Sequence, residues 1–422
     1  MKLNVCLMND SFPPLIDGVS NTVINYARII HSTLGNATVV TPKYPKTVDS
    51  YEFPVMRYPS FPTTRFVGYR TGYPFSLKTL RRLEAMKFDI LHSHCPMASN
   101  LLARTLRERV DAPLILTYHT KFDIEIGKVF TSEHMRSLAS RIVVNNIKVC
   151  DEVWVVSRGA GENLRTLGYE GDYIVMPNGV DLPRTDPDPV TRAEMRRQFG
   201  ISDDTPVFLF VGRCMWYKGF RFALDAMKKL KSAGRSFKYI VVGDSKEKDE
   251  IRAYAEECGL GDDSIFVGSV YDRQEICRYF GMADLFLFPS TFDTNGLVVR
   301  EAAAMALPSL IIKDSCAAEG ITHMKNGILA EEDADSIAAE IAATLDRPGK
   351  LREIGRNAQA EIYIPWEDAV TQAYQRYEYL YEKMRRGEIP RKDVSGNGIF
   401  ELVADWSAVM SKMSRRSGKT ER

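Results

Sequence analysis

The sequence lacks both a long apolar run and an excess of charge of one sign. No stretch approaches the roughly 18 uninterrupted apolar residues of a membrane-spanning helix, and 56 Lys and Arg against 55 Asp and Glu leave a formal net charge of +1. This balance argues against a nucleic-acid binder that relies on bulk charge. The first apolar run, Leu3–Met8, meets Asn9-Asp10 too soon for a signal peptide. We therefore expect a cytoplasmic protein that could bind peripherally at the inner face of the plasma membrane.

Cysteine is scarce and scattered. The seven residues show no CxxC spacing, and they are Cys6, Cys95, Cys150, Cys214, Cys258, Cys277 and Cys316. Their odd number and wide spacing are typical of a reducing compartment, and they argue against a disulfide framework or a cysteine-rich zinc site.

Short apolar runs alternate with amphipathic stretches, the pattern of βαβ units around a buried parallel sheet. With 422 residues and 45% hydrophobic content, the chain can bury two such cores. The expected strands are Leu3–Met8, Ala37–Val40, Ile90–His92, Leu114–Thr117, Glu152–Val156, Tyr173–Val175, Val207–Val211, Lys238–Val242, Ser264–Val267, Leu285–Phe288 and Ser309–Ile312. They predict an α/β protein of two Rossmann-like, doubly wound domains facing a central cleft, with ligands at the carboxyl ends of the strands.

A proline-rich segment separates the two halves. Asp181–Pro189, DLPRTDPDP, holds three prolines and is typical of a hinge or linker. We expect an N-terminal domain at 1–182, a linker at 183–200 and a C-terminal domain at 201–365. C-terminal helices at 366–422 would return to the N-terminal domain and end in a basic tail.

Two basic residues follow the expected strand Val207–Val211 and precede a helix. Gly212 permits a tight turn, and Arg213 and Lys218 place two cations beside the helix N-terminus. The helix dipole and both cations together favour a diphosphate. The segment is not a Walker sequence, and a loop with two solvated bases fits the spacing equally well.

An acidic pattern follows the expected strand Leu285–Phe288. Asp293 lies on the loop after this strand, and Glu301 lies about one turn inside the next helix. Between them, Gly296 and Leu297 would offer backbone N–H groups. Two carboxylates flanking a helix start suit hydrogen bonds to sugar and ribose hydroxyls. The structural alternative makes Asp293 a helix cap and Glu301 a solvated residue.

In combination, these motifs resemble the family-four retaining glycosyltransferases of the two-domain GT-B fold. The resemblance extends from Asp17-Gly18-Val19-Ser20 to about Trp366. The matching segments are PNGVD at 177–181, GR-x4-KG at 212–219, DLFLFPS at 284–290, the acid-x7-Glu pattern from Asp293 to Glu301, and MKNGILA at 324–330. The resemblance implies transfer of a sugar from a nucleotide-sugar donor.

The resemblance also implies roles for the charged residues of the two motifs. Arg213 and Lys218 would hold the donor diphosphate and the charge that develops on it as the glycosidic bond breaks. Glu301 would bind the ribose hydroxyls, and Asp293 the hydroxyls of the transferred sugar. The family usually has Glu in place of Asp293, so the shorter acid leaves open which sugar hydroxyl is held.

Three glycine and backbone positions complete the implied donor site. Gly296 and Leu297 would contribute amides to the sugar and phosphate. Gly18 would let the first strand-to-helix loop approach the phosphates, because glycine has no side chain. The resemblance implies no metal or other cofactor, since basic side chains take the metal's place at the diphosphate. It also implies front-face attack assisted by the leaving phosphate, so no protein nucleophile is assigned.

His119 follows the expected strand Leu114–Thr117 and would face the donor sugar across the cleft. A lone histidine is often structural, but this one ends a strand in the expected loop. His92 and His94 match a family position that mostly supports the cleft. The predicted catalytic residues are His119, Arg213, Lys218 and Asp293.

The N-terminal half is expected to hold the acceptor. Residues 60–110 contain nine Lys and Arg against three Asp and Glu, and 74–88 predicts a basic amphipathic helix. Such a helix fits an anionic lipid surface, or equally a core-facing helix with a solvated basic side. Near the C-terminus, the apolar face of 406–413 would dock on the N-terminal domain, and the tail after it could also touch a bilayer.

The segments 118–123 and 291–301 look most like the bacterial diacylglycerol glucosyltransferases. This branch implies transfer of glucose from UDP-glucose to a lipid acceptor, diacylglycerol, by a peripheral membrane enzyme. Mannosyl transfer to phosphatidylinositol and transfer to a soluble sugar acceptor are alternatives within the family. A nucleotide-sugar epimerase and a non-catalytic nucleotide-sugar binder are the alternatives of other classes.

Overall fold

The computed structural model describes residues 1–15, 17–64, 68–130 and 132–390. The chain divides into two compact units, each with its own parallel sheet. The N-terminal unit comprises Met1–Pro177 and the chain from Glu367 onward, and the C-terminal unit comprises Asn178–Trp366. The boundary therefore lies at Pro177 rather than after residue 182.

The N-terminal unit is built on a seven-stranded parallel sheet of order β3-β2-β1-β6-β7-β8-β9. Its strands are β1 (Asn4–Met8), β2 (Asn36–Pro42), β3 (Val55–Tyr58), β6 (Ile90–Ser93), β7 (Leu114–Tyr118), β8 (Glu152–Val155) and β9 (Ile174–Val175). A small antiparallel pair, β4 (Ser60–Phe61) and β5 (Thr71–Gly72), lies apart from this sheet. The helices of this unit are α1 (Gly18–Ile29), α3 (Leu77–Glu84), α4 (Ala98–Arg107), α5 (Phe122–Val129), α6 (Glu133–Lys148), α7 (Arg158–Thr166) and α15 (Trp366–Arg385).

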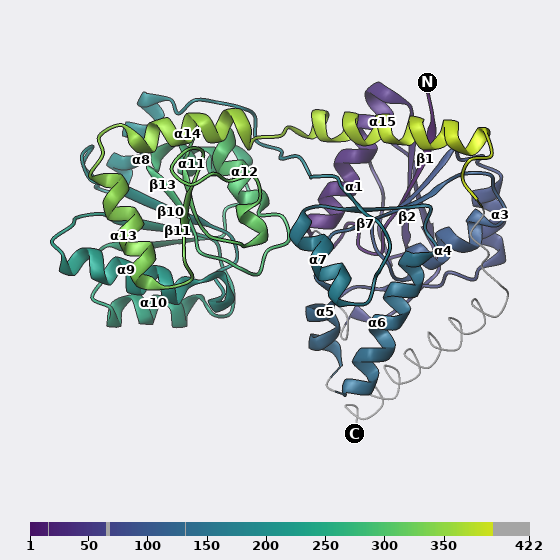
Figure 1. The fold of residues 1–422 in the computed structure, drawn as a ribbon, viewed down its shortest axis with the longest axis horizontal. Helices are drawn as coiled ribbons and strands as arrows, with labels where there is room; N and C mark the ends of the chain where they lie inside the picture. The colour runs from purple at the N-terminus through teal and green to yellow at the C-terminus, as the bar shows by residue number, and fades with distance from the viewer. Residues whose placement is uncertain (16, 65–67, 131, 391–422) are drawn as a thin grey trace. The chain divides into compact units, whose positions relative to one another are not determined.

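The C-terminal unit is built on a six-stranded parallel sheet of order β12-β11-β10-β13-β14-β15. Its strands are β10 (Val207–Val211), β11 (Lys238–Val242), β12 (Ser264–Gly268), β13 (Leu285–Phe288), β14 (Ser309–Ile312) and β15 (Ile328–Ala330). Its helices are α8 (Pro189–Gln198), α9 (Phe220–Ser232), α10 (Lys248–Glu257), α11 (Arg273–Met282), α12 (Leu297–Ala304), α13 (Ala334–Leu345) and α14 (Lys350–Glu361). Figure 1 shows α8, α11, α12 and α14 on one side of this sheet and α9, α10 and α13 on the other.

The central strands are apolar along their length because helices cover both faces of a doubly wound sheet. In β13 all four residues are buried, and in β10 only the last residue, Val211, is partly exposed. The two sheets confirm the predicted pair of Rossmann-like, doubly wound units. Carboxyl ends of parallel strands meet at one edge of each sheet, so the loops that follow them are brought together.

Residues 189–198 of the expected linker form the helix α8. Pro189 occupies the first turn, where proline is tolerated, and the Asp188 side chain caps the helix by accepting from the N–H groups of Val190 and Thr191. The prediction of a linker at 183–200 is therefore wrong for this segment. Prolines and acidic residues are typical of a linker, but here Asp188 and Pro189 form the start of a helix.

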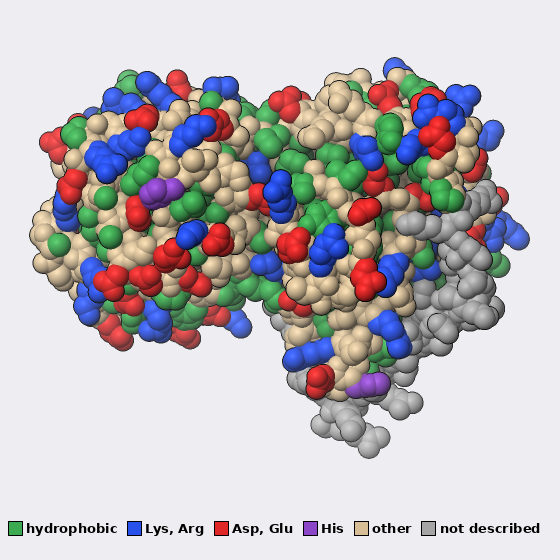
Figure 2. Space-filling model, viewed as in Figure 1, with side chains coloured by type: hydrophobic (Ala, Val, Ile, Leu, Met, Phe, Trp, Pro, Cys, Tyr) green, Lys and Arg blue, Asp and Glu red, His purple; other side chains and the backbone are tan. Residues whose placement is uncertain are grey.

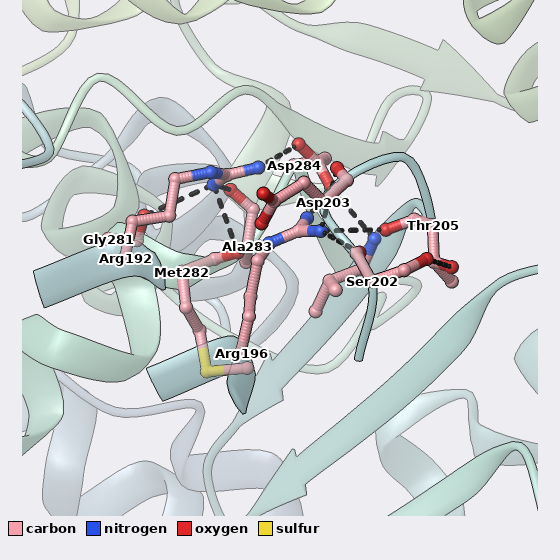
Figure 3. A network of polar contacts seen from close by, with 10 residues as sticks. Arg192, Arg196, Ser202, Asp203, Thr205, Gly281, Met282, Ala283 and Asp284 are labelled. Carbon is pink, nitrogen blue, oxygen red and sulfur yellow. Dashed lines mark hydrogen bonds and ion pairs between the residues drawn. The ribbon is translucent and has the colours of Figure 1, made fainter. Parts of the chain in front are cut away.

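Two arginines of α8 join it to the start of β13 (Figure 3). Arg192 and Arg196 contact the two oxygens of Asp284 at 2.5 and 2.6 Å. Arg192 also donates to the carbonyls that end α11, and Arg196 to carbonyls of the loop before β10. The Asp284 carboxylate accepts from the Val207 N–H as well. This network holds α8, α11, β10 and β13 together.

The long helix α15 packs on the N-terminal unit (Figure 1), and its hydrogen bonds reach the residues just before β1. The Tyr374 hydroxyl accepts from Leu3 N–H and donates to the Met1 carbonyl. Arg376 forms an ion pair with Glu152. The chain thus returns to the N-terminal unit after residue 366. The predicted helical face at 406–413 and the basic tail lie outside the described residues.

Charged side chains of both signs are interspersed over the face shown in Figure 2, in keeping with the net charge of +1. Among the described residues, no helix combines the length and the apolar character needed to cross a bilayer.

Candidate functional site

The two predicted donor motifs follow neighbouring strands at the centre of the C-terminal sheet. β10 pairs with β13, and Phe208 lies opposite Leu285. From β10 the chain winds outward through β11 and β12, and from β13 it winds the other way through β14 and β15. In such sheets, ligands bind outside the carboxyl ends of the strands at which the order reverses. The loops after β10 and β13 flank this point.

The two loops touch through a glycine. Gly219 has φ 81°, and a Cβ placed on it would lie 2.0 Å from the Pro289 carbonyl oxygen. Any larger residue would push the loop after β10 away from the loop after β13. The glycine of the GR-x4-KG pattern therefore lets the preceding Lys218 approach the acidic loop.

Lys218 and Asp293 form the ion pair at this point. The Lys218 Nζ donates to both carboxylate oxygens of Asp293, at 2.6 and 2.8 Å, and the lysine is 8% exposed. Ser290 Oγ donates to Asp293 Oδ2 at 2.7 Å and fixes the same carboxylate from its own loop. The ammonium lies 5.6 Å from the Phe288 ring centroid. A largely buried cation is thus preorganised where two loops meet.

Arg213 is the second cation of this loop and is exposed. Within the described part of the chain, its guanidinium has neither a hydrogen bond nor an ion pair. It differs in this from Arg273, an exposed arginine of the same unit that is held by carboxylates. Arg213 thus keeps all its donors for a ligand.

The start of α12 presents backbone amides beside Asp293. Gly296 takes the position before the helix with φ 57°, and an added Cβ would lie 2.8 Å from Ala317 Cβ. Leu297 begins the helix, whose first N–H groups have no partner inside it. Asn295, 8% exposed, has no hydrogen bond from either side-chain atom to the described residues. A buried amide without a partner is costly, which indicates a ligand contact.

Glu301 lies on α12 and is bound by an arginine from α11. Arg273 Nη2 contacts Glu301 Oε1 at 2.8 Å and Asp181 Oδ2 at 3.1 Å. Burial raises the pKa of the Glu301 carboxyl, and Arg273 offsets only part of this effect. The alternative in which Glu301 is merely a solvated surface residue is therefore wrong. Its Oε2 atom bonds no described residue.

In the N-terminal unit, Gly18 begins α1 directly after the Asp17 cap. Asp17 Oδ1 accepts from Ser20 N–H at 2.7 Å, and Ser20 Oγ accepts from the Asp17 N–H. Gly18 is exposed, and a Cβ added to it would meet no described atom within 4 Å. The fold itself does not require glycine there, and the start of the helix is open to close approach.

His119 belongs to a group of three buried histidines at the ends of β6 and β7. Its Nε2 lies 3.0 Å from His94 Nδ1. His92 bonds to Tyr377 on α15 and to Thr117 on β7. Burial lowers the pKa of His119 to about 3 and the pKa values of His92 and His94 well below their usual range. All three rings are therefore neutral near pH 7.

His94 and His119 share a hydrogen bond, whereas His92 bonds to two hydroxyl groups and packs its ring against His94. No group of three or more His, Cys, Asp or Glu side chains in the described ranges is placed to hold a metal ion. His94 Nε2 is buried and bonds no described residue. The group is thus a polar support beneath the carboxyl edge of the N-terminal sheet, with one ring nitrogen unused.

Two family models together cover most of the chain. Residues 16–184 match the model of Glycosyltransferase Family 4, and residues 191–361 match that of Glycosyl transferases group 1. The chain is a family-four glycosyltransferase.

The relatives and the fold agree with this assignment. The enzyme is 22% identical over 368 residues to the alpha-monoglucosyldiacylglycerol synthase of Acholeplasma laidlawii. This alignment covers 85% of the present chain and 92% of the relative. It is 24% identical over 302 residues to the GDP-mannose-dependent alpha-(1-6)-phosphatidylinositol dimannoside mannosyltransferase of Mycobacterium tuberculosis, 72% of this chain and 76% of that one. Anabaena Alr3699/HepE in complex with UDP superposes with a TM-score of 0.71 at 20% identity, over 90% of this chain and all of that chain. The GT-B fold is thereby confirmed.

The structure of this glycosyltransferase brings some predicted residues together and adds two others. Lys218 and Asp293 are in direct contact, whereas Glu301 is joined to Arg273 instead. Neither Arg273 nor Asn295 was predicted as a site residue. Asn295 lies inside the acid-x7-Glu pattern and could have been found there. Arg273 lies on α11 and Glu301 on α12, and no motif in the sequence predicts that these two side chains meet.

The histidine group predicts acid sensitivity of the glycosyltransferase. Above the unfolded-state pKa of about 6.5, both states carry neutral rings. As the pH falls below 6.5, these histidines bind protons in the unfolded chain, whereas burial keeps His92, His94 and His119 neutral in the folded protein. The free energy of unfolding therefore decreases until the pH reaches the lowered pKa values of the folded state. We expect a steepest loss of about 4 kcal/mol per pH unit for three such sites. Urea unfolding at pH 7.5, 6 and 5 measures it.

A variant separates these histidines from the carboxylates, which also titrate in acid. His119→Gln should reduce the loss between pH 6.5 and 5 by about a third, since one of three sites is removed. His134→Gln, at an exposed position on α6, is the matched control and should behave as the wild type. A free energy of unfolding that stays constant from pH 7.5 to 5 would contradict the prediction.

Proposed function

We propose that this enzyme transfers glucose from UDP-glucose to diacylglycerol with retention of the anomeric configuration and without a metal ion. The observation that carries the proposal is the largely buried Lys218, held by Asp293 where β10 and β13 diverge, with the unpaired Arg213 on the same loop. One cation that is fixed by an ion pair, a second exposed cation and the start of α9 favour a diphosphate there.

Lys218 and Arg213 stabilise the leaving diphosphate in this account. A lysine ammonium has three N–H donors, of which Asp293 uses two, so one remains for a phosphate oxygen. Arg213 brings a planar fork that suits phosphate oxygens. Charge accumulates on the diphosphate as the bond to the sugar breaks. Lys218, already fixed by Asp293, stabilises that charge without reorganisation, and Arg213 adds a second positive charge. These two side chains supply what a metal ion would otherwise supply.

Asp293, Asn295 and Glu301 hold hydroxyl groups. Asp293 is already oriented by Lys218 and Ser290, and the buried amide of Asn295 lies two residues further on. We assign both to hydroxyls of the transferred sugar. Glu301 keeps its Oε2 for the ribose, while Arg273 holds its Oε1. Ionised Glu301 is the form that accepts hydroxyl hydrogen bonds, so Arg273 supports donor binding by opposing protonation.

The reaction needs no protein nucleophile. The bond between the sugar C1 and the diphosphate oxygen breaks, and a bond from C1 to the acceptor oxygen forms on the same face. The acceptor hydroxyl loses its proton to an oxygen of the leaving phosphate, so charge and atoms balance. Neutral His119 is suited to hydrogen bonding rather than to carrying a positive charge. We assign it to a hydroxyl of the sugar.

The relatives favour this donor and acceptor. The Acholeplasma laidlawii enzyme is named for glucosyl transfer to diacylglycerol and aligns over most of both chains. HepE, of the same fold, was solved with UDP. Mannosyl transfer to phosphatidylinositol is the second candidate, favoured by the Mycobacterium tuberculosis relative. The family assignment favours transfer over epimerisation.

A transfer assay tests the proposal. The full-length enzyme is incubated with UDP-glucose, UDP-galactose or GDP-mannose and with vesicles that contain diacylglycerol or phosphatidylinositol. We expect glucosyl-diacylglycerol and UDP from one combination, and stabilisation of the enzyme against heat by UDP-glucose in particular. Product only from GDP-mannose and phosphatidylinositol would replace the proposal with the second candidate. Epimerised donor without any acceptor product would overturn transfer altogether.

A further inference from the structure

The N-terminal unit contains a pocket that the donor site does not use. It has a volume of about 730 Å³ and lies where β2, β3 and the start of α3 meet. Six basic residues line it, and they are Lys43, Lys46, Arg57, Arg70, Lys78 and Arg82. No Asp or Glu is among the lining residues. Like charges gathered around one cavity repel each other, so an arrangement of this kind indicates an anionic ligand.

Two of the cations are fixed in the wall of the pocket. Arg57 forms an ion pair with Asp49 at 2.7 Å. Arg70 donates to Ser60 Oγ at 2.9 Å and to the Lys43 carbonyl at 3.0 Å, and it has no carboxylate partner within the described ranges. These bonds hold the guanidinium of Arg70 in place while leaving its positive charge uncompensated.

The other four cations stay available to a ligand. All are exposed, and none forms an ion pair with a described residue; they are Lys43, Lys46, Lys78 and Arg82. The start of α3 adds to the positive potential, since Ser76 caps the helix and lines the pocket together with Thr79. A helix N-terminus favours negative charge. The fixed guanidinium of Arg70, the four exposed cations and the N-terminal end of α3 thus all lie at one cavity.

Exposed apolar side chains lie close in sequence to residues that line the pocket. Four of the large hydrophobic residues that are exposed in the described part lie in the segment 48–77, and they are Val48 at 88%, Phe61 at 42%, Tyr73 at 40% and Leu77 at 60%. On α3, Leu80 and Leu83 pack into the N-terminal core, so Leu77 is set apart by its exposure. A ligand with a charged group and an apolar part fits this combination.

Arg57 joins the pocket to the loop that precedes Gly18. Its Nη2 atom donates to the Pro13 carbonyl at 2.6 Å, and Pro13 lies between β1 and α1. The pocket therefore belongs to the same edge of the N-terminal sheet as the start of α1.

We propose that this pocket binds the phosphate group of a phosphate ester and serves as a subsite on the acceptor side. Because diacylglycerol itself carries no phosphate, the bound compound is one that lies beside the proposed acceptor. The assignment to the acceptor side rests on the proposed transfer reaction, whereas phosphate binding does not. A lipid headgroup and a soluble phosphate ester share this chemistry. Several ammonium groups and an arginine fork match the oxygens of a phosphate better than those of a single carboxylate.

Binding measurements on the full-length protein test the pocket. The variant Lys43→Gln/Lys78→Gln/Arg82→Gln removes three exposed pocket cations. The matched control, Lys2→Gln/Arg81→Gln/Lys87→Gln, removes three exposed cations of the same unit that do not line the pocket. Calorimetric titration with sn-glycerol 3-phosphate forms one arm. Sedimentation with vesicles of phosphatidylcholine and phosphatidylglycerol in equal parts forms the other.

We expect the pocket variant to bind on the order of tenfold more weakly in at least one arm, and the control to stay within about twofold of the wild type. Loss in the titration assigns a soluble phosphate ester, and loss confined to the vesicles assigns a lipid headgroup. Wild-type binding by the pocket variant in both arms, or an equal loss by the control, overturns the proposal. Because both arms measure binding without donor, a failed transfer assay leaves their result standing.

Discussion

Lys218→Ala is expected to lower kcat on the order of hundredfold at saturating donor. Lys218 is 8% exposed and its ammonium is fixed by Asp293, so in the proposed reaction it contacts the leaving diphosphate from a preorganised position. Loss of one preorganised contact to transition-state charge has an effect of about this size. The measurement is the initial rate of UDP release with acceptor present, at several donor concentrations, so that kcat is separated from KM.

A lysine on the following helix provides the control. Lys229 lies on α9 and pairs with Asp335 in an exposed ion pair. Lys229→Ala should keep the wild-type rate, because this lysine lies in the last turn of α9, at the opposite end from Gly219, and its ion pair is solvated. If Lys218→Ala retained full kcat while remaining folded, the diphosphate role of this residue would be refuted.

Asp284→Asn is expected to destabilise the C-terminal unit by about 3 kcal/mol or more. The substitution removes the only carboxylate that the described residues place against both Arg192 and Arg196. The Arg196 side chain is 2% exposed, and a buried charge that loses its partner is costly. For a unit of this size, the midpoint of thermal unfolding should fall by roughly 6–12 °C.

An exposed aspartate serves as the comparison for that loss. Asp346 pairs with Arg235 on the surface, with side chains 56% and 38% exposed. Asp346→Asn should cost far less than Asp284→Asn, because solvent screens such pairs. Urea unfolding of both variants measures the difference. Equal, small effects would show that Asp284 does not organise α8 and β13.

The strands of both sheets could be predicted because helices cover them on both sides. Continuous apolar runs such as Val207–Val211 identify such strands directly. β3 (Val55–Tyr58) was missed because it is four residues long, lies between two prolines and alternates in burial. α8 was missed for a different reason, since Pro189 and Asp188 start a helix with the same residues that mark a linker.

The candidate site could be predicted at the level of loops and not of contacts. The motifs of Arg213 and Asp293 each follow an apolar strand, and the order of a doubly wound sheet makes those strands neighbours. Which side chains then meet depends on loop conformation and helix rotation. The Lys218–Asp293 pair needs the close approach at Gly219, and the Glu301–Arg273 pair needs two helices in one orientation. Neither of these two ion pairs can be predicted from the residues that are adjacent in sequence.

The shorter acid now has a physical description. Asp293 holds Lys218 with both oxygens and accepts from Ser290. Its carboxylate therefore holds Lys218 in place and is also a candidate for the proposed contact with the sugar hydroxyls. The buried amide of Asn295 lies beside it in sequence and is free to take over part of that sugar contact.

The anomeric configuration of the product tests the central claim most directly. The full-length enzyme is supplied with UDP-α-glucose and diacylglycerol, and the coupling constant of the anomeric proton is measured by ¹H NMR on the purified glycolipid. Transfer assisted by the leaving phosphate, with Lys218 and Arg213 stabilising the diphosphate, predicts the α-linked product. A β-linked product would contradict front-face transfer and with it the assignment of this site.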